Sequence, residues 1–160
     1  MSAAEALLEA LRRRGWTLGV AESLTGGALS GEIVSVPGAS ATLLGAVVAY
    51  ATPLKHTLLG VDADLLDEHG PVHSLVAEQM ADGIRRAVAV DGEPADVGLS
   101  TTGIAGPDSP DGQPVGTVHI GVVTPSGRQS FSYVFAGSRA EIRMQSVDAA
   151  IRAALTVVAE

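Results

Sequence analysis

The order of apolar and helical segments along this 160-residue chain is the feature that most restricts its fold. Short apolar runs bounded by turn residues predict five strands, at 17–22, 45–51, 96–101, 115–124 and 129–135. The last two runs are joined by Pro125-Ser126-Gly127-Arg128, which predicts an antiparallel hairpin. The run at 45–51 is apolar throughout and is expected to be a buried strand.

Helical patterns fill most of the sequence between these strands. Apolar spacing and stop signals predict helices at 2–14, from Gly27 to about 34, at 53–59, 62–69 and 74–90, and from Ser138 to about 159. The segment 39–44 fits neither pattern. The resulting order, α-β-α-β-α-α-β-β-β-α, predicts a three-layer α/β/α fold with a mixed sheet of about five strands. The length suits one domain, 1–160, without internal repeats or linkers.

Composition excludes several classes of function. The chain has no cysteine, so it has neither a thiolate nucleophile nor a Cys-ligated metal. Its formal net charge is −8 and aromatic residues make up 3%, so nucleic acid is not an expected partner. No apolar run has the length of a membrane span, and the N-terminal segment lacks the pattern of a signal peptide. The expected location is the cytoplasm.

Two glycine-containing segments follow predicted strands. Ser23, Thr25, Gly26 and Gly27 lie between the first strand and a helix, where free N–H groups can bind a phosphate. Ser23 or Thr25 can equally act only as a helix cap. The segment 101–108 leaves the third strand and enters a loop whose N–H groups can bind a phosphate or an oxyanion, although a purely structural loop has the same pattern.

Lys55 is the only lysine in the chain, and it follows the predicted strand at 45–51. Desolvation there would lower its pKa and allow the neutral amine to act as a general base for a serine. An ordinary solvated lysine is the alternative. Ser40, after Pro37-Gly38, is either a nucleophile or a helix cap.

Arg139 and Arg143 lie one turn apart at the start of the last helix. They can bind a phosphate, or they can pair with nearby carboxylates such as Glu141. His69 and His73 are separated by a Gly-Pro break, and the H-E-x-x-H motif is absent. No metal site is therefore expected.

These segments together resemble the CinA C-terminal domain family, whose enzymatic members are nicotinamide-nucleotide amidohydrolases. The resemblance covers nearly the whole chain in order. It is carried by AESLTGG at 21–27, VPGAS at 36–40, VVAYATPLKHTLLGV at 47–61, HGPV at 69–72, TTGIAGPD at 101–108, PVGTV at 114–118 and GSR…IR…Q at 137–145.

The resemblance implies hydrolysis of the carboxamide of nicotinamide mononucleotide, without metal or cofactor, by a serine–lysine pair. The lysine is Lys55, and Ser40 is favoured over Ser23 as the nucleophile, with the reverse assignment left open. Residues expected to bind the substrate are Tyr50, Thr25, Gly26, Gly27, Thr102, Gly103, Gly106, Arg139 and Arg143.

The sequence departs from the family pattern at three places. Leu24 stands where the family usually has cysteine, YATPLK replaces the more usual YSNEAK, and HGPVHS replaces HGAVSE. The molybdopterin-binding-like domain of full-length CinA proteins is absent, so a stand-alone unit is expected.

The alternatives to this enzyme are a non-catalytic nucleotide-binding or regulatory module and a hydrolase for a different pyridine nucleotide or another small amide. Family members are linked to competence or DNA damage, but the acidic charge argues against direct DNA binding. A homo-oligomer is expected, with a dimer favoured.

Overall fold

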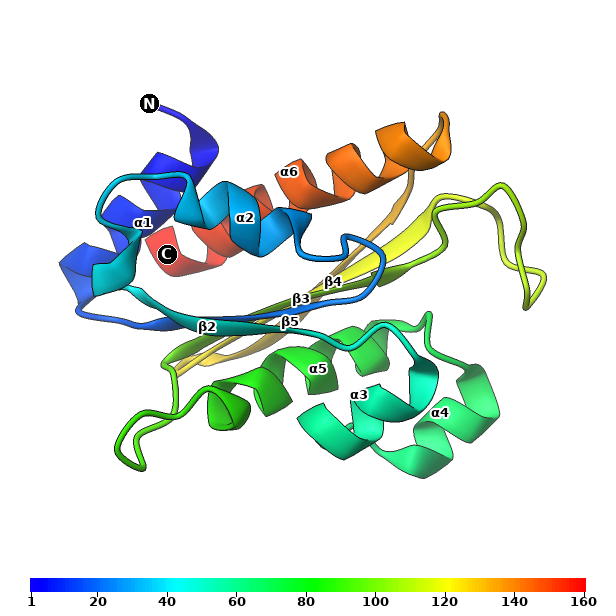
Figure 1. Cartoon of the computed structure of the whole chain (residues 1–160), viewed down its shortest axis with the longest axis horizontal. Helices are drawn as coiled ribbons and strands as arrows, with labels where there is room; N and C mark the ends of the chain where they lie inside the picture. The colour runs from blue at the N-terminus through cyan, green and yellow to red at the C-terminus, as the bar shows by residue number, and fades with distance from the viewer.

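The computed structural model describes all 160 residues as a mixed sheet between two layers of helices (Figure 1). The strand order is β2-β1-β3-β4-β5, with β1 parallel to β2 and β3, and the last two pairings antiparallel. The strands are β1 (Leu18–Glu22), β2 (Leu43–Val48), β3 (Val97–Gly103), β4 (Thr117–Thr124) and β5 (Gly127–Val134). The predicted α/β/α class and the five-stranded mixed sheet are confirmed.

The helices divide between the two faces of the sheet. One layer holds α1 (Ala3–Arg14), α2 (Ala28–Val34) and α6 (Arg139–Ala159); the other holds α3 (Thr52–Leu59), α4 (Ala63–His69) and α5 (Ser74–Ala87). The first layer covers the larger apolar core, and the second covers a smaller one. None of these helices is long and apolar enough to span a bilayer.

Local sequence signals account for the helix ends. Ser2 and Ser138 each form a capping box with the glutamate three residues later, at the starts of α1 and α6. Gly15 ends α1 in the left-handed conformation, at φ 67°. The undecided segment 39–44 divides between a short 3₁₀ helix, Ala39–Ala41, and the start of β2.

The expectation that the 45–51 strand is buried is wrong. β2 lies at one edge of the sheet and ends at Val48, and the side chains of Ala46 and Val48 are exposed. An apolar run suits a central strand and an edge strand equally. Its position in the sheet depends on pairing with β1, which the local pattern does not encode.

Two sheet glycines allow α5 to lie directly on the strands. A Cβ added to Gly98 would be 1.7 Å from the carbonyl oxygen of Ala81, and one added to Gly121 would be 2.2 Å from that of Ala77. These backbone contacts leave no room for a side chain. They fix the position of α5, and so of the segment before it, relative to the end of β3.

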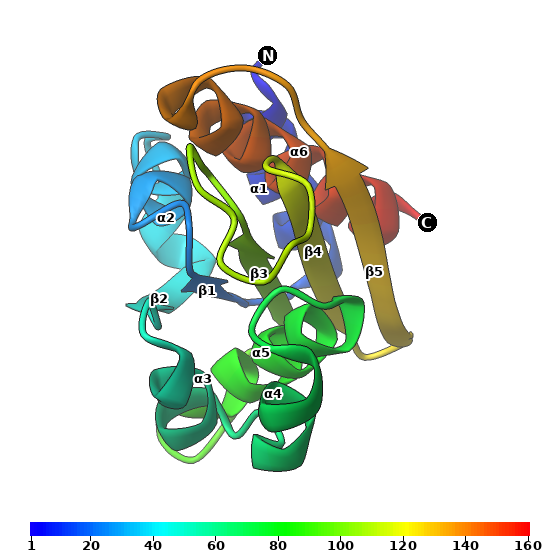
Figure 2. The same ribbon diagram turned by 90° about the vertical axis from the view of Figure 1, so that its right-hand side faces the viewer.

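The carboxyl ends of the three parallel strands meet at one edge of the sheet. β1 lies between β2 and β3, and the connections on its two sides cross opposite faces: α2 on one, α3 to α5 on the other. Ligands of open α/β sheets bind at such a topological switch point. Figure 2 looks onto this edge, where the 103–114 loop lies between the turn before α2 and the segment before α5.

Candidate active site

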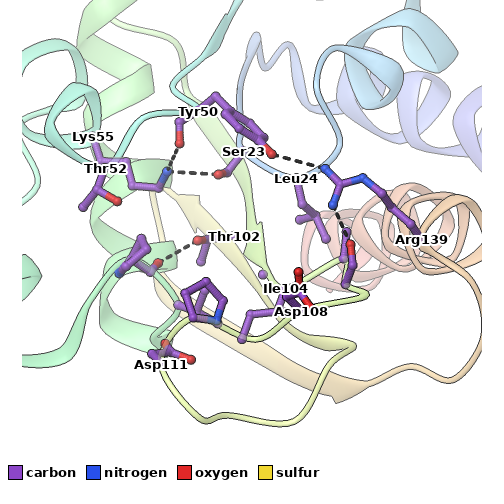
Figure 3. A pocket seen from close by; sticks show the side chains of 16 residues that line it. Ser23, Leu24, Tyr50, Thr52, Lys55, Thr102, Ile104, Asp108, Asp111 and Arg139 are labelled. Carbon is purple, nitrogen blue, oxygen red and sulfur yellow. Dashed lines mark hydrogen bonds between the residues drawn. The ribbon is translucent and has the colours of Figure 1, made fainter.

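A buried lysine and a serine are hydrogen-bonded at this switch point (Figure 3). Ser23 is the first residue after β1, and Lys55 comes from the first half of α3. Lys55 Nζ donates to Ser23 Oγ at 2.9 Å, to the Ala49 carbonyl at 2.7 Å and to the Tyr50 carbonyl at 3.3 Å. The lysine is 1% exposed, which agrees with the desolvated lysine and not with the solvated alternative.

The environment of Lys55 favours its neutral form. Burial lowers the pKa of Lys55 from 10.5 to about 8. No salt bridge of the chain includes this lysine. Its neutral amine keeps two N–H donors for the two carbonyls and presents its lone pair to the serine hydroxyl. Such a neutral amine can accept the serine proton. With a pKa of about 8, roughly one molecule in ten has Lys55 in the neutral form at pH 7.

Ser23 and Lys55 open into a cavity of about 370 Å³, a size typical of small-molecule sites. Its walls come from the turn after β1, the β2–α3 connection, the segment before α5, the loop after β3 and the start of α6. The predicted residues that line it are Ser23, Lys55, Tyr50, Thr102, Gly103, Gly106 and Arg139.

Arg139 and the glycine loop form the side of the cavity opposite Lys55. The exposed Arg139 donates from Nη1 to the Gly106 carbonyl at 2.6 Å and from Nη2 to the Tyr50 hydroxyl at 3.2 Å. No carboxylate pairs with this guanidinium. The N–H groups of Ala105 and Gly106 have no acceptor within the chain. This wall can therefore bind an anion.

The helix start at Gly26-Gly27 is not available for a phosphate, which corrects one prediction. The buried Glu22 carboxylate already accepts from the N–H groups of Gly27, Leu29 and Ser30, at 2.9 to 3.0 Å. It also accepts from the Ser30 hydroxyl at 2.6 Å. A carboxylate satisfies the free donors of a helix start as a phosphate would.

Three further residues of the predicted site also lie outside the cavity. Thr25 is fully buried, and its hydroxyl bonds that of Thr101 at 2.9 Å. Arg143 turns away from the cavity and donates to the carbonyls of Leu24 and Thr25, at 2.9 and 3.0 Å. Gly26 lies beside this guanidinium and lines no part of the cavity.

Ser40 does not meet Lys55, which corrects the favoured assignment of the two serines. It is exposed in the 3₁₀ helix before β2 and lines a separate hollow near the amino end of that strand. Lys55 follows the opposite end of β2 and bonds Ser23 instead. Ser40 precedes β2 and Lys55 follows it, so the strand itself separates the two side chains.

Some cavity residues were not predicted. Asp108 and Asp111 bring carboxylates to the 103–114 loop side, and Pro71 and Val72 form the wall before α5. Thr102 donates to the Pro71 carbonyl at 2.6 Å, which joins that wall to β3. The conspicuous Gly-Pro pair at 70–71 was a signal for this wall. Glu22 does not line the cavity, and its only sequence feature was its position at the end of the first strand; its bonds to the start of α2 were not predicted.

Comparison with known proteins agrees with this architecture. The family model for the CinA C-terminal domain matches residues 1–158. A CinA-like protein of Frankia casuarinae is 45% identical over 91% of this chain, and a putative competence-damage inducible protein of Desulforamulus reducens is 43% identical over 88%. The alignments cover 32% and 33% of those relatives, so the chain spans about a third of their length.

Solved structures of similar length share the fold. A CinA superfamily protein from Klebsiella pneumoniae superposes with a TM-score of 0.90 at 28% identity, covering 99% of both chains. The competence/damage inducible protein CihA from Agrobacterium tumefaciens gives 0.89 at 28% identity, covering 99% of this chain and 94% of that one. With the family model spanning nearly every residue, the chain belongs to the CinA C-terminal domain family.

Proposed function

We propose that the chain hydrolyses the carboxamide of nicotinamide mononucleotide to nicotinate mononucleotide and ammonia. The observation that carries this proposal is the 2.9 Å bond between the buried Lys55 Nζ and Ser23 Oγ. A serine beside a desolvated amine is the arrangement of Ser–Lys hydrolases. Membership of a family that includes amidohydrolases supports the same chemistry.

The geometry supports the following acylation step. Neutral Lys55 accepts the Ser23 proton as Oγ attacks the carboxamide carbon, and the carbonyl oxygen becomes an oxyanion. Lys55 then donates this proton to the departing nitrogen, and ammonia leaves. A nicotinoyl ester on Ser23 remains.

The second half of the reaction uses the same pair. Neutral Lys55 takes a proton from water as the water oxygen attacks the ester carbon. The C–Oγ bond breaks and Ser23 recovers its proton from Lys55. Nicotinate mononucleotide leaves, and both side chains have returned to their starting states. Each step involves only proton transfer and acyl transfer.

The cavity also suits the rest of the substrate. Ile104 and Val72, apolar residues that line the same cavity as Ser23, can contact the pyridine ring. The phosphate then lies toward Arg139, whose guanidinium has no carboxylate partner. This orientation places the anion at the exposed side of the cavity and the amide at its buried end.

The decisive experiment compares two serine variants, Ser23→Ala and Ser40→Ala. Ammonia release from nicotinamide mononucleotide is measured with and without chelator. We expect chelator-insensitive turnover that falls at least a thousandfold in Ser23→Ala and in Lys55→Ala, and that is unchanged in Ser40→Ala. Folded native protein that binds the nucleotide without releasing ammonia would favour a regulatory module. Turnover that survives in Lys55→Ala would refute the mechanism.

A further inference from the structure

Two consecutive backbone N–H groups beside Ser23 have no hydrogen-bond acceptor. From Ser23 to Gly31, every backbone N–H has a partner in the chain except those of Leu24 and Thr25. Both residues are buried, at 5% and 0% exposure, and Leu24 lines the cavity. Buried N–H groups without a partner are rare in folded proteins. Because Leu24 lines the cavity and Thr25 does not, the Leu24 N–H is the one that an external acceptor can reach.

The direction of these N–H groups is fixed by the carbonyls of the same peptide units. In a trans peptide the N–H points opposite to the C=O. The Ser23 carbonyl accepts from Gly26 N–H at 3.1 Å, which orients the Leu24 N–H. The Leu24 carbonyl accepts from Arg143 Nε at 2.9 Å, which orients the Thr25 N–H.

Arg143 is built to hold this turn rather than to bind a ligand. From α6 it donates to two successive carbonyls: Nε to that of Leu24 and Nη2 to that of Thr25, the second at 3.0 Å. It forms no salt bridge. A planar guanidinium can hold two neighbouring acceptors at once, which a lysine ammonium does less well.

We propose that the Leu24 N–H group forms the oxyanion site of the Ser23 reaction and that Arg143 is the positioning residue that holds the turn carrying it. The inference deepens the function proposed above and rests on it for the natural substrate. Donors directly after a nucleophile stabilise the negative charge that develops on the attacked carbonyl oxygen. Arg143 itself touches no reacting atom.

Arg143→Gln, Arg143→Lys and the control Arg152→Gln test this role. Arg152 lies on the same helix and pairs with Asp148 at the surface. Two rates are measured: ammonia release from nicotinamide mononucleotide, and labelling of Ser23 by a fluorophosphonate, which also needs oxyanion stabilisation. We expect Arg143→Gln to lower kcat and the labelling rate about a hundredfold, with KM within about threefold. Arg143→Lys recovers part of both rates, and Arg152→Gln retains both.

The two rates separate this inference from the proposed function. Labelling that depends on Arg143 in a protein that releases no ammonia would sustain the inference and reject the substrate. Ammonia release and labelling at native rates in Arg143→Gln would overturn the inference and leave the function. A native protein that does neither would overturn both. A rise in KM with native kcat would assign Arg143 to substrate binding and overturn the positioning role.

Discussion

Burial of Lys55 makes the stability of this protein depend on pH in a specific way. A lysine with a pKa of about 8 in the folded chain and 10.5 in the unfolded chain releases its proton earlier when folded. Between these two values the unfolded chain binds more protons, so the free energy of unfolding rises with pH. Below about pH 8 the folded protein holds Lys55 as a buried ammonium ion, and the gain in unfolding free energy from its deprotonation is absent.

The size of the effect follows from the two pKa values. The difference between 10.5 and about 8 corresponds to about 3 kcal/mol when fully developed. Between pH 7 and about pH 9.5 roughly 2 kcal/mol of it appears. In Lys55→Met the side chain keeps a similar length but no longer titrates. The difference in unfolding free energy between native protein and variant therefore rises by about 2 kcal/mol over this interval in favour of the native protein.

Urea unfolding at pH 7 and pH 9.5 measures this difference. The single tryptophan, Trp16, packs against the larger core and reports the transition by its fluorescence. All other titrating groups are common to both proteins, so their contributions cancel. Loss of the hydrogen bonds to Ala49 and Tyr50 shifts the variant equally at both pH values. A difference that stays constant with pH would refute the desolvation of Lys55 and remove the physical basis for its role as a base.

Three further predictions concern the Lys55 amine, the Glu22 carboxylate and the packing of α5 on the sheet. Because the neutral amine is the active form, kcat/KM for nicotinamide mononucleotide rises about tenfold per pH unit up to the Lys55 pKa of about 8 and then levels off; a flat profile from pH 6 to 9 contradicts this. Glu22→Gln replaces one acceptor oxygen with a donor that faces N–H groups, and urea unfolding is expected to show a loss of about 2 to 3 kcal/mol. Gly98→Ala inserts a methyl group 1.7 Å from a backbone oxygen and costs more than about 2 kcal/mol, whereas Gly31→Ala, with no atom within 4 Å, is neutral or stabilising; equal midpoints for the two variants refute the close packing of α5.

The fold was predictable because its signals are local. The capping residues Ser2 and Ser138 and the glycine after α1 mark helix ends without reference to any other part of the chain. The hairpin turn joins two adjacent strands and determines their pairing. The exposure of β2 was mispredicted because the order of strands in the sheet is a long-range property. Ser40 was misassigned for a different reason. It precedes β2 and Lys55 follows it, so the order of the sequence already separates the two residues by the length of a strand.

The site was predictable only as a set of candidate segments. Scarcity singled out Lys55, and the strand end singled out Ser23, but the bond between them joins residues 32 positions apart. The arginines of α6 show the limit most clearly. Arg139 and Arg143 have the same side chain and lie one turn apart, yet one lines the cavity and the other grips the turn after Ser23. The α6 sequence cannot distinguish them because their partners lie far away in the chain. Arg139 bonds the segments after β2 and β3, and Arg143 bonds the turn after β1.

The internal carboxylate Glu22 bears on how the proposed nucleotide substrate can bind. In many α/β proteins the phosphate binds at the start of the helix that follows the first strand. Here Glu22 satisfies that helix start and adds a negative charge, so a phosphate there would be repelled. In the proposed binding mode the anion lies instead on the side of the cavity away from Lys55, where Arg139 and the free N–H groups of the 105–106 segment provide donors. In this binding mode the other end of the proposed nucleotide extends toward Ser23 and Lys55. For the proposed reaction, the same carboxylate that occupies the usual phosphate site thus favours the orientation that brings the carboxamide to Ser23.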